Sequence, residues 1–344
     1  MSARIPLPDT DLPLVAAPMA GGPTSPELVD AVGAAGALPI VAGGYLSPDA
    51  LAARIDRARA TGRPFGVNLF APGPDGPAAL DRAAFDRYAV ALAPEAAALG
   101  VRLDPEPQRD DDAWADKLAL LLEDPVPLVT VTFALPEVAA IAALRRTGTC
   151  VLVTVTTPAE ARAAAGAGAD GLVVQGARAG GHCGTWDPAR EIGDEPTADV
   201  VRAVRAVTDL PMIAAGGVDS PGAVRALLAA GAEAAAVGTL LLRADEAGTS
   251  PVHRAALADP GRGETVITRA YTGRPARSLR TAFMDRHRDA PTAYPAIHHL
   301  TRALRARAAA TGDVERVHLW AGTGHRAARQ LPAAEILRDL AAGV

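Results

Sequence analysis

The chain has 344 residues, of which 49% are apolar and 21% charged, close to ordinary globular usage and enough to bury a large core. The net charge of -5 is mild and no run of five basic residues occurs, so nucleic acid is not an expected partner. Two cysteines, Cys150 and Cys183, are too few for a disulfide framework or a four-ligand zinc site, and no metal site is predicted.

Nothing in the sequence indicates a membrane or an export route. Met1 to Asp11 has no basic run followed by an apolar run, and no apolar stretch reaches about 18 residues. The sequence therefore predicts a cytoplasmic protein. Because apolar surface patches cannot be located in so alanine-rich a chain, both a monomer and a homodimer stay open.

Eight short apolar runs follow one another along the chain, and most are separated by a helical segment. Strands of near-continuous apolar character are buried on both faces, as in parallel sheets. Eight βα units in succession favour an α/β fold of the closed (β/α)8 TIM-barrel type over an open sheet. The predicted strands are Leu14–Ala17, Leu38–Val41, Phe65–Leu69, Leu128–Phe133, Cys150–Val155, Gly171–Gln175, Met212–Ala215 and Ala234–Val237.

Two segments interrupt this pattern. Residues 72–127 are rich in proline and are predicted as an irregular, partly helical excursion, in which Arg109 to Asp112 form a solvated loop. Residues 249–316 follow the eighth strand and are predicted as a small, mainly helical lid domain, with a helix over 294–310. The predicted organisation is a (β/α)8 barrel in 1–248, a lid or substrate domain in 249–316 and a segment in 317–344 that returns to the barrel.

The loops after the seventh and eighth strands have the composition of a phosphate site. Strand seven runs into Gly216-Gly217, and strand eight into Gly238-Thr239. Glycines let backbone N–H groups approach an anion closely, and barrels often bind phosphate at this place. Either glycine pair alone is equally typical of a tight turn, but two pairs on adjacent strands favour phosphate binding. FMN and phosphorylated sugars both use such loops.

The loop after the sixth strand, Gln175 to Gly184, surrounds one histidine with four glycines. His182 therefore stands at a strand's carboxyl end, where a barrel holds its reacting groups, and an imidazole can exchange a proton near neutral pH. The alternative is a surface loop with an incidental histidine. Cys183 and Cys150 are read as packing residues rather than nucleophiles. His298, His299 and His318 lack metal-site spacing and are expected at the surface or in packing.

Together these segments resemble the nitronate monooxygenase family over nearly the whole chain, and the histidine loop is the most specific of them. Two departures concern the substrate more than the flavin. Val131 to Pro136 lacks the glycine that the family often carries in this loop, and Cys183 stands where an arginine is common. The matching segments are Ala17–Gly22, the run to Gly43-Gly44, Phe65–Phe70, Gln175–Gly184, Gly216-Gly217, Val237–Thr239, Thr272–Arg277 and Trp320–Gly322.

The resemblance implies FMN as cofactor and a small molecule with O2 as reactants. A nitronate, or a parent nitroalkane, would be oxidised to a carbonyl compound and nitrite through a flavin semiquinone. His182 would be the base or the nitronate-binding group. Met19 and Asn68 would approach the flavin ring, and Gly217 the phosphate. The implied cofactor-binding residues are Pro18, Met19, Ala20, Asn68, Gln175, Gly180, Gly181, Gly216, Gly217, Ala236, Val237, Gly238 and Thr239.

Two other functions fit the same motifs. An FMN-dependent enoyl-thioester reductase using NAD(P)H would share the barrel, the phosphate loops and a similar histidine loop. It would be recognised by rapid bleaching of its flavin with NADPH in the absence of oxygen. A non-catalytic flavin- or phosphate-binding barrel would bind FMN and turn over no substrate.

Overall fold

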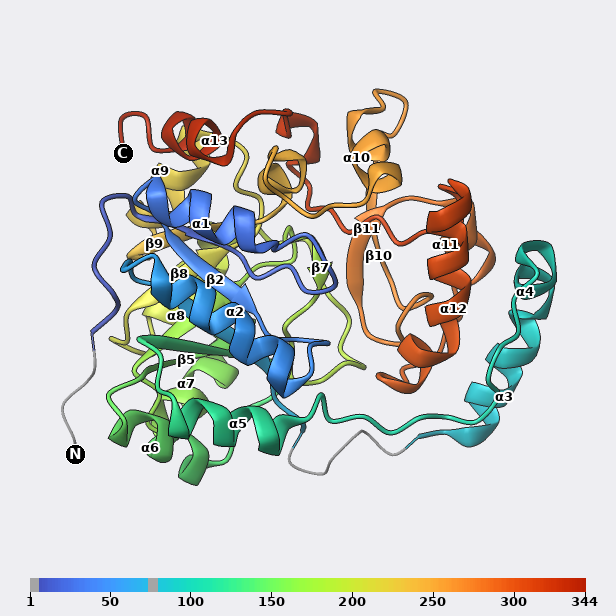
Figure 1. Ribbon diagram of the computed structural model, residues 1–344, viewed down its shortest axis with the longest axis horizontal. Helices are drawn as coiled ribbons and strands as arrows, with labels where there is room; N and C mark the ends of the chain where they lie inside the picture. Colours follow the sequence, from blue (N-terminus) through green and yellow to red (C-terminus); the bar gives the residue numbers. More distant parts are fainter. Residues whose placement is uncertain (1–5, 74–79) are drawn as a thin grey trace.

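The computed structural model describes residues 6–73 and 80–344. Parts of the predicted N-terminal segment (1–5) and excursion (74–79) lie outside the described residues. Eight parallel strands close into a barrel in the order β1-β2-β3-β4-β5-β6-β8-β9, which confirms the predicted fold (Figure 1). The strands are β1 (Leu14–Ala16), β2 (Leu38–Ala42), β3 (Gly66–Phe70), β4 (Leu128–Thr132), β5 (Cys150–Val155), β6 (Gly171–Gln175), β8 (Met212–Ala215) and β9 (Ala234–Val237).

Successive side chains of a barrel strand point alternately into the barrel interior and outward toward the surrounding helices. On β4, Val129 and Val131 face outward and pack beneath the helices, whereas Leu128 faces the barrel interior. This division follows from the two-residue period of a strand. Cys150 and Leu152 of β5 also fill the interior, so Cys150 is a packing residue as predicted.

The helices that cover the barrel begin at residues typical of helix N-termini, as α2 shows. Ser47 caps α2 by accepting a hydrogen bond from the Ala50 amide at 3.2 Å, and Pro48 occupies the first helical turn. Among the described residues no helix combines the length and apolarity needed to cross a bilayer. The helices around the barrel are α1 (Pro26–Ala34), α2 (Pro48–Ala60), α5 (Trp114–Glu123), α6 (Val138–Arg146), α7 (Pro158–Gly166), α8 (Thr197–Arg205), α9 (Pro221–Ala229) and, near the C-terminus, α13 (Ala333–Leu340).

The segment after β9 lies beside the carboxyl ends of the strands (Figure 1), and we use the name lid for its residues 249–327. It contains a three-stranded sheet that the sequence did not predict, in the order β10-β11-β7. Strand β7 (Gly181–His182) comes from the histidine loop, so this sheet joins the lid to the barrel. The other elements are η1 (Thr239–Arg243), α10 (Pro251–Ala258), β10 (Thr265–Thr268), β11 (Ala276–Leu279), α11 (Ala282–Arg286), α12 (Ala296–Thr311) and η2 (His325–Ala327).

The excursion after β3 packs on the lid through its first two helices, α3 (Arg82–Ala91) and α4 (Ala93–Leu99), which lie outside α12 in Figure 1. Phe85 and Tyr88 share a buried apolar cluster with Tyr271 of the lid. We call residues 82–99 the arm. The arm therefore carries part of the lid's core, and α5 then returns the chain to the barrel beside α2.

The prediction of a solvated loop at 109–112 is wrong for its last residue. Arg109, Asp110 and Asp111 are exposed, but the Asp112 side chain is only 13% exposed. Its Oδ2 lies 2.7 Å from Nζ of the buried Lys117, and its Oδ1 accepts the Tyr45 amide at 2.8 Å. A buried ammonium needs a paired carboxylate, and the burial of Lys117 is set by tertiary packing that the local sequence does not show.

Candidate active site

A cavity of about 490 Å³ lies between the carboxyl ends of the barrel strands and the lid. Its volume is within the range of about 300–1,000 Å³ that is usual for small-molecule sites. Of the predicted site residues only Val237 does not line it, because its side chain points outward into the helix layer. The cavity contains Pro18, Met19, Ala20, Asn68, Gln175, Gly180, Gly181, His182, Gly216, Gly217, Ala236, Gly238 and Thr239.

The two predicted phosphate loops lie side by side, because β8 and β9 are paired up to Ala215 and Ala236. Gly216 and Gly217 have φ angles of 118° and 74°, which side chains rarely adopt. The Thr239 hydroxyl oxygen accepts the Gly322 amide at 2.9 Å. Its own hydrogen remains available for a ligand, so these loops can offer donors to an anion.

Polar side chains occupy the interior positions at the mouth of the barrel. The Asn68 Nδ2 donates to the hydroxyl oxygens of Thr130 and Thr132, each at 2.9 Å. Within the described residues the Asn68 Oδ1 has no donor, and the residue lines the cavity. Asn68 is therefore held with a hydrogen-bond acceptor free for a ligand.

The histidine loop is fixed by its neighbours. The Gln175 Oε1 accepts the Gly184 amide at 2.6 Å, and its Nε2 donates to the His182 carbonyl at 3.2 Å. A Cβ on Gly180 would lie 2.5 Å from the Gly322 amide nitrogen, so this close approach requires glycine. Gln175 and Gly180 therefore fix the position of the His182 side chain.

The imidazole of His182 is enclosed by aromatic rings and carries one specific contact. Its Nε2 lies 2.9 Å from the Thr272 hydroxyl oxygen, and the rings of Phe133, Tyr294 and Trp320 surround it. Burial, followed by the nearby charges of Arg274 and Arg305, lowers the pKa of His182 to about 3. The imidazole is therefore neutral at physiological pH. Its Nδ1 makes no hydrogen bond with the residues that the structure describes.

The lid supplies a polar wall that sequence reasoning missed. His318, expected at the surface or in packing, lines the cavity, whereas His298 does pack, stacked on Tyr45 at 4.6 Å. The face of α12 repeats polar residues at 298, 302 and 305, and this helical spacing was the available signal. The wall residues that line the cavity are His253, Arg302, Arg305, His318 and Trp320. No cluster of three or more metal-ligand side chains occurs within residues 6–73 and 80–344.

Comparison with known proteins identifies the family. A family model described as nitronate monooxygenase matches residues 8–343. The chain belongs to the nitronate monooxygenase family. It is 34% identical to a nitronate monooxygenase of Paraburkholderia phytofirmans, over 98% of this chain and 93% of that protein. It is 31% identical to a probable nitronate monooxygenase of Bacillus subtilis, over 91% of this chain and 90% of that one.

Solved structures agree with this family. A nitroalkane oxidase from Streptomyces ansochromogenes is 48% identical with a TM-score of 0.91, covering 97% of this chain and 96% of that chain. FabK from Thermotoga maritima is 27% identical with a TM-score of 0.73, covering 96% and 92%. The sequence-based resemblance is confirmed, and the chain is an oxidoreductase of the nitronate monooxygenase family.

The loop after β4, which lacks the glycine common in the family, contains a residue in a left-handed backbone conformation. Phe133 stands in this loop with a φ of 87°, a conformation that costs a non-glycine residue about 1–2 kcal/mol. Its ring packs against Phe70, and the Arg274 guanidinium lies 4.1 Å above it. The loop of this chain thus has a left-handed residue that places an aromatic side chain beside His182.

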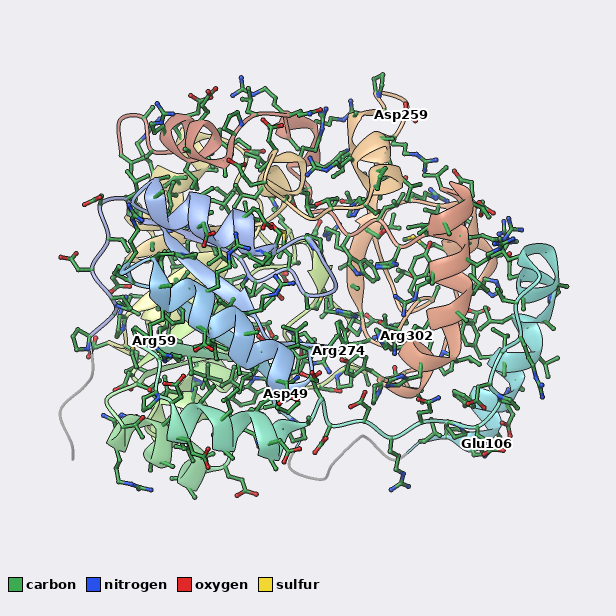
Figure 2. The ribbon with its side chains drawn as sticks, viewed as in Figure 1. Asp49, Arg59, Glu106, Asp259, Arg274 and Arg302 are labelled. Carbon is green, nitrogen blue, oxygen red and sulfur yellow. The ribbon has the colours of Figure 1, made fainter. Side chains whose placement is uncertain are left out.

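Arg274 and Cys183 lie together at the position of the second departure. Arg274 is buried at the junction of barrel and lid (Figure 2) and donates to the carbonyl oxygens of Thr185, Cys183 and Phe133. Cys183 is buried as well, and burial raises the pKa of its thiol to about 11. The thiol is therefore protonated at neutral pH and is a poor nucleophile.

Proposed function

We propose that the protein binds FMN in this cavity and uses O2 to oxidise alkyl nitronates to carbonyl compounds and nitrite. The observation that carries the proposal is the placement of a neutral His182, with a free Nδ1, in the same cavity as the paired glycine loops. Membership of the nitronate monooxygenase family supports both the flavin and the substrate class.

The residues present fit FMN. Gly217, Gly238 and Thr239 would hold the phosphate, since two adjacent loops offer closely approachable backbone and one free hydroxyl hydrogen. The unpaired Oδ1 of Asn68 would accept an N–H of the flavin ring. When bound, FMN supplies the electron-accepting chemistry that amino-acid side chains lack.

The state of His182 favours a nitronate over the neutral nitroalkane. With a pKa of about 3, the imidazole is too weak a base for efficient proton removal from carbon near pH 7. A nitronate needs no such removal, and the Nδ1 of His182 can hydrogen-bond one of its oxygens. The similarity to a structure titled nitroalkane oxidase makes nitroalkane oxidation the second candidate.

Oxygen uptake and nitrite release test the proposal directly. The FMN-loaded protein should oxidise ethylnitronate with a kcat/KM well above that for nitroethane at the same pH. His182→Ala should retain FMN and lose about 10- to 100-fold of this activity, the effect of losing a hydrogen bond to a charged group. Equal activity of this variant with FMN bound would remove His182 from the reaction.

Anaerobic mixing with NADPH separates the other candidates. Rapid bleaching of the flavin together with no nitronate turnover would favour the enoyl-thioester reductase. Bound FMN with no turnover of nitronate, enoyl thioester or quinone would indicate a non-catalytic flavin-binding barrel.

A further inference from the structure

Arg305 on α12 is a buried cation that faces the cavity. It is 8% exposed and lines the cavity wall opposite the barrel strands. Burial lowers the pKa of its guanidinium to about 10, which leaves it protonated at neutral pH. Among the described residues no carboxylate lies within ion-pair distance of it. The positive charge is therefore not balanced by the protein.

The Arg305 guanidinium is fixed by hydrogen bonds to the protein but still has unused N–H donors. Its Nε donates to the Thr301 hydroxyl oxygen at 3.1 Å, and its Nη2 donates to the His298 carbonyl at 2.9 Å and to the His298 Nδ1 at 3.3 Å. Its Nη1 has no acceptor among the described residues. Two N–H groups and a full charge thus remain for a ligand, and leaving them unpaired in a buried place is costly.

Two further wall residues are left with unpaired nitrogens. The Nδ1 of His318 and the Nε2 of His253 are buried and have no hydrogen-bond partner among the described residues, and both side chains line the cavity. His253 is itself 7% exposed, and burial lowers its pKa to about 4. Both imidazoles are neutral, so each can donate one N–H to a ligand without a proton being taken up.

Arg302 lies one turn before Arg305 on the same helix. Its side chain is exposed and also lines the cavity, so it stands where the cavity opens to solvent. Positive charge therefore continues from the mouth of the cavity to its interior. Such an arrangement raises the local concentration of anions and speeds their association.

We propose that Arg305 binds the negatively charged group of the substrate through the two N–H groups of Nη1. A protonated guanidinium donates charge-assisted hydrogen bonds to an oxyanion such as a nitronate, a carboxylate or nitrite. His182 is neutral, so Arg305 supplies the charge that holds the anion and His182 supplies the hydrogen bond. The identity of this anion as a nitronate rests on the proposed function; the anion site itself does not.

Calorimetric titration with sodium nitrite tests the site without depending on turnover. The protein should bind nitrite, and Arg305→Gln should weaken binding by about 10- to 100-fold, the effect of losing a charged hydrogen-bond pair. Arg305→Lys, which keeps the charge, should weaken it less. Arg307→Gln is the matched control, because Arg307 is an exposed arginine of the same helix outside the cavity, and its affinity should stay within about twofold.

Nitrite binding and nitronate turnover, measured together, distinguish the anion site from the proposed reaction. Nitrite binding that requires Arg305, without nitronate turnover, would retain the anion site and overturn the nitronate reaction. Unchanged nitrite affinity and unchanged nitronate KM in Arg305→Gln would overturn the anion site alone. Should Arg305→Gln unfold, Arg305→Met, which fills similar space without a charge, decides: nitrite affinity and nitronate KM equal to those of the unaltered protein would show that the guanidinium has no part in binding.

Discussion

His182 and Thr272 meet across the junction of barrel and lid, with the imidazole Nε2 2.9 Å from the hydroxyl oxygen. The hydroxyl also lies within 3.4 Å of backbone atoms of Arg274, so its own position is fixed. This contact fixes the orientation of the ring, and when the hydroxyl donates to Nε2 the imidazole carries its proton on Nδ1. Thr272 is therefore the residue that directs Nδ1 of His182 toward the cavity.

Thr272→Val should lower kcat for a nitronate by about 5- to 10-fold, corresponding to one lost hydrogen bond. The valine keeps the shape of the side chain but cannot fix the imidazole. Thr272→Ser should restore most of kcat, and FMN content should be the same in all three proteins. Steady-state kinetics checks this, and a valine variant with unaltered kcat would show that Thr272 only packs.

Gly217→Ala should weaken FMN binding, whereas Gly148→Ala should not. Both glycines have positive φ angles, 74° and 88°, so each alanine should cost about 1 kcal/mol of folding free energy. Only Gly217 lines the cavity. Urea unfolding should report similar losses, and titration of the apoprotein with FMN should separate the two variants. Equal FMN affinity in both would place the phosphate elsewhere.

Stability should fall steeply as the pH drops from about 6.5 to 4. Burial lowers the pKa of His182 to about 3, of His253 to about 4 and of His298 to about 2, all below the usual value near 6.5. In this window the unfolded chain binds more protons than the folded one, so lowering the pH favours unfolding. Each such histidine should contribute up to about 1.4 kcal/mol per pH unit.

His253→Gln tests whether buried neutral histidines cause the loss of stability at low pH. The variant removes one of these titrating groups and should show a shallower loss of unfolding free energy between pH 6.5 and 4. Chemical denaturation at several pH values measures the slope. A slope that matches that of the unaltered protein would mean that His253 is not buried in its neutral form.

The ion pairs of Glu95 are expected to stabilise the packing of the arm on the lid. Its carboxylate is 5% exposed and accepts from the Nε atoms of Arg286 and Arg316, each at 2.6 Å. Glu95→Gln should reduce the unfolding free energy by about 1–3 kcal/mol. The control is Glu106→Gln, because Glu106 (Figure 2) is 74% exposed and, among the described residues, pairs only with the exposed Arg82, so its loss should be below about 1 kcal/mol. Equal effects in thermal or urea unfolding would contradict a fastening role for Glu95.

The barrel and its strand-end motifs were predictable because they depend on local patterns. Apolar runs define β5 and β6 to the residue, and Gly216-Gly217 follows its strand directly in sequence. Val237 does not line the cavity because its side chain lies on the outward side of β9, which the motif did not distinguish. The polar wall was missed for another reason: helical spacing places residues 298, 302 and 305 on one face of α12, but only the tertiary packing of the lid turns Arg305 and His318 toward the cavity.

The most direct test of a flavin site facing His182 is the visible spectrum of the purified protein with identification of the released chromophore. The spectrum should be that of a bound flavin, released as FMN at about one per chain. A colourless preparation that takes up no added FMN would contradict the assignment of this cavity.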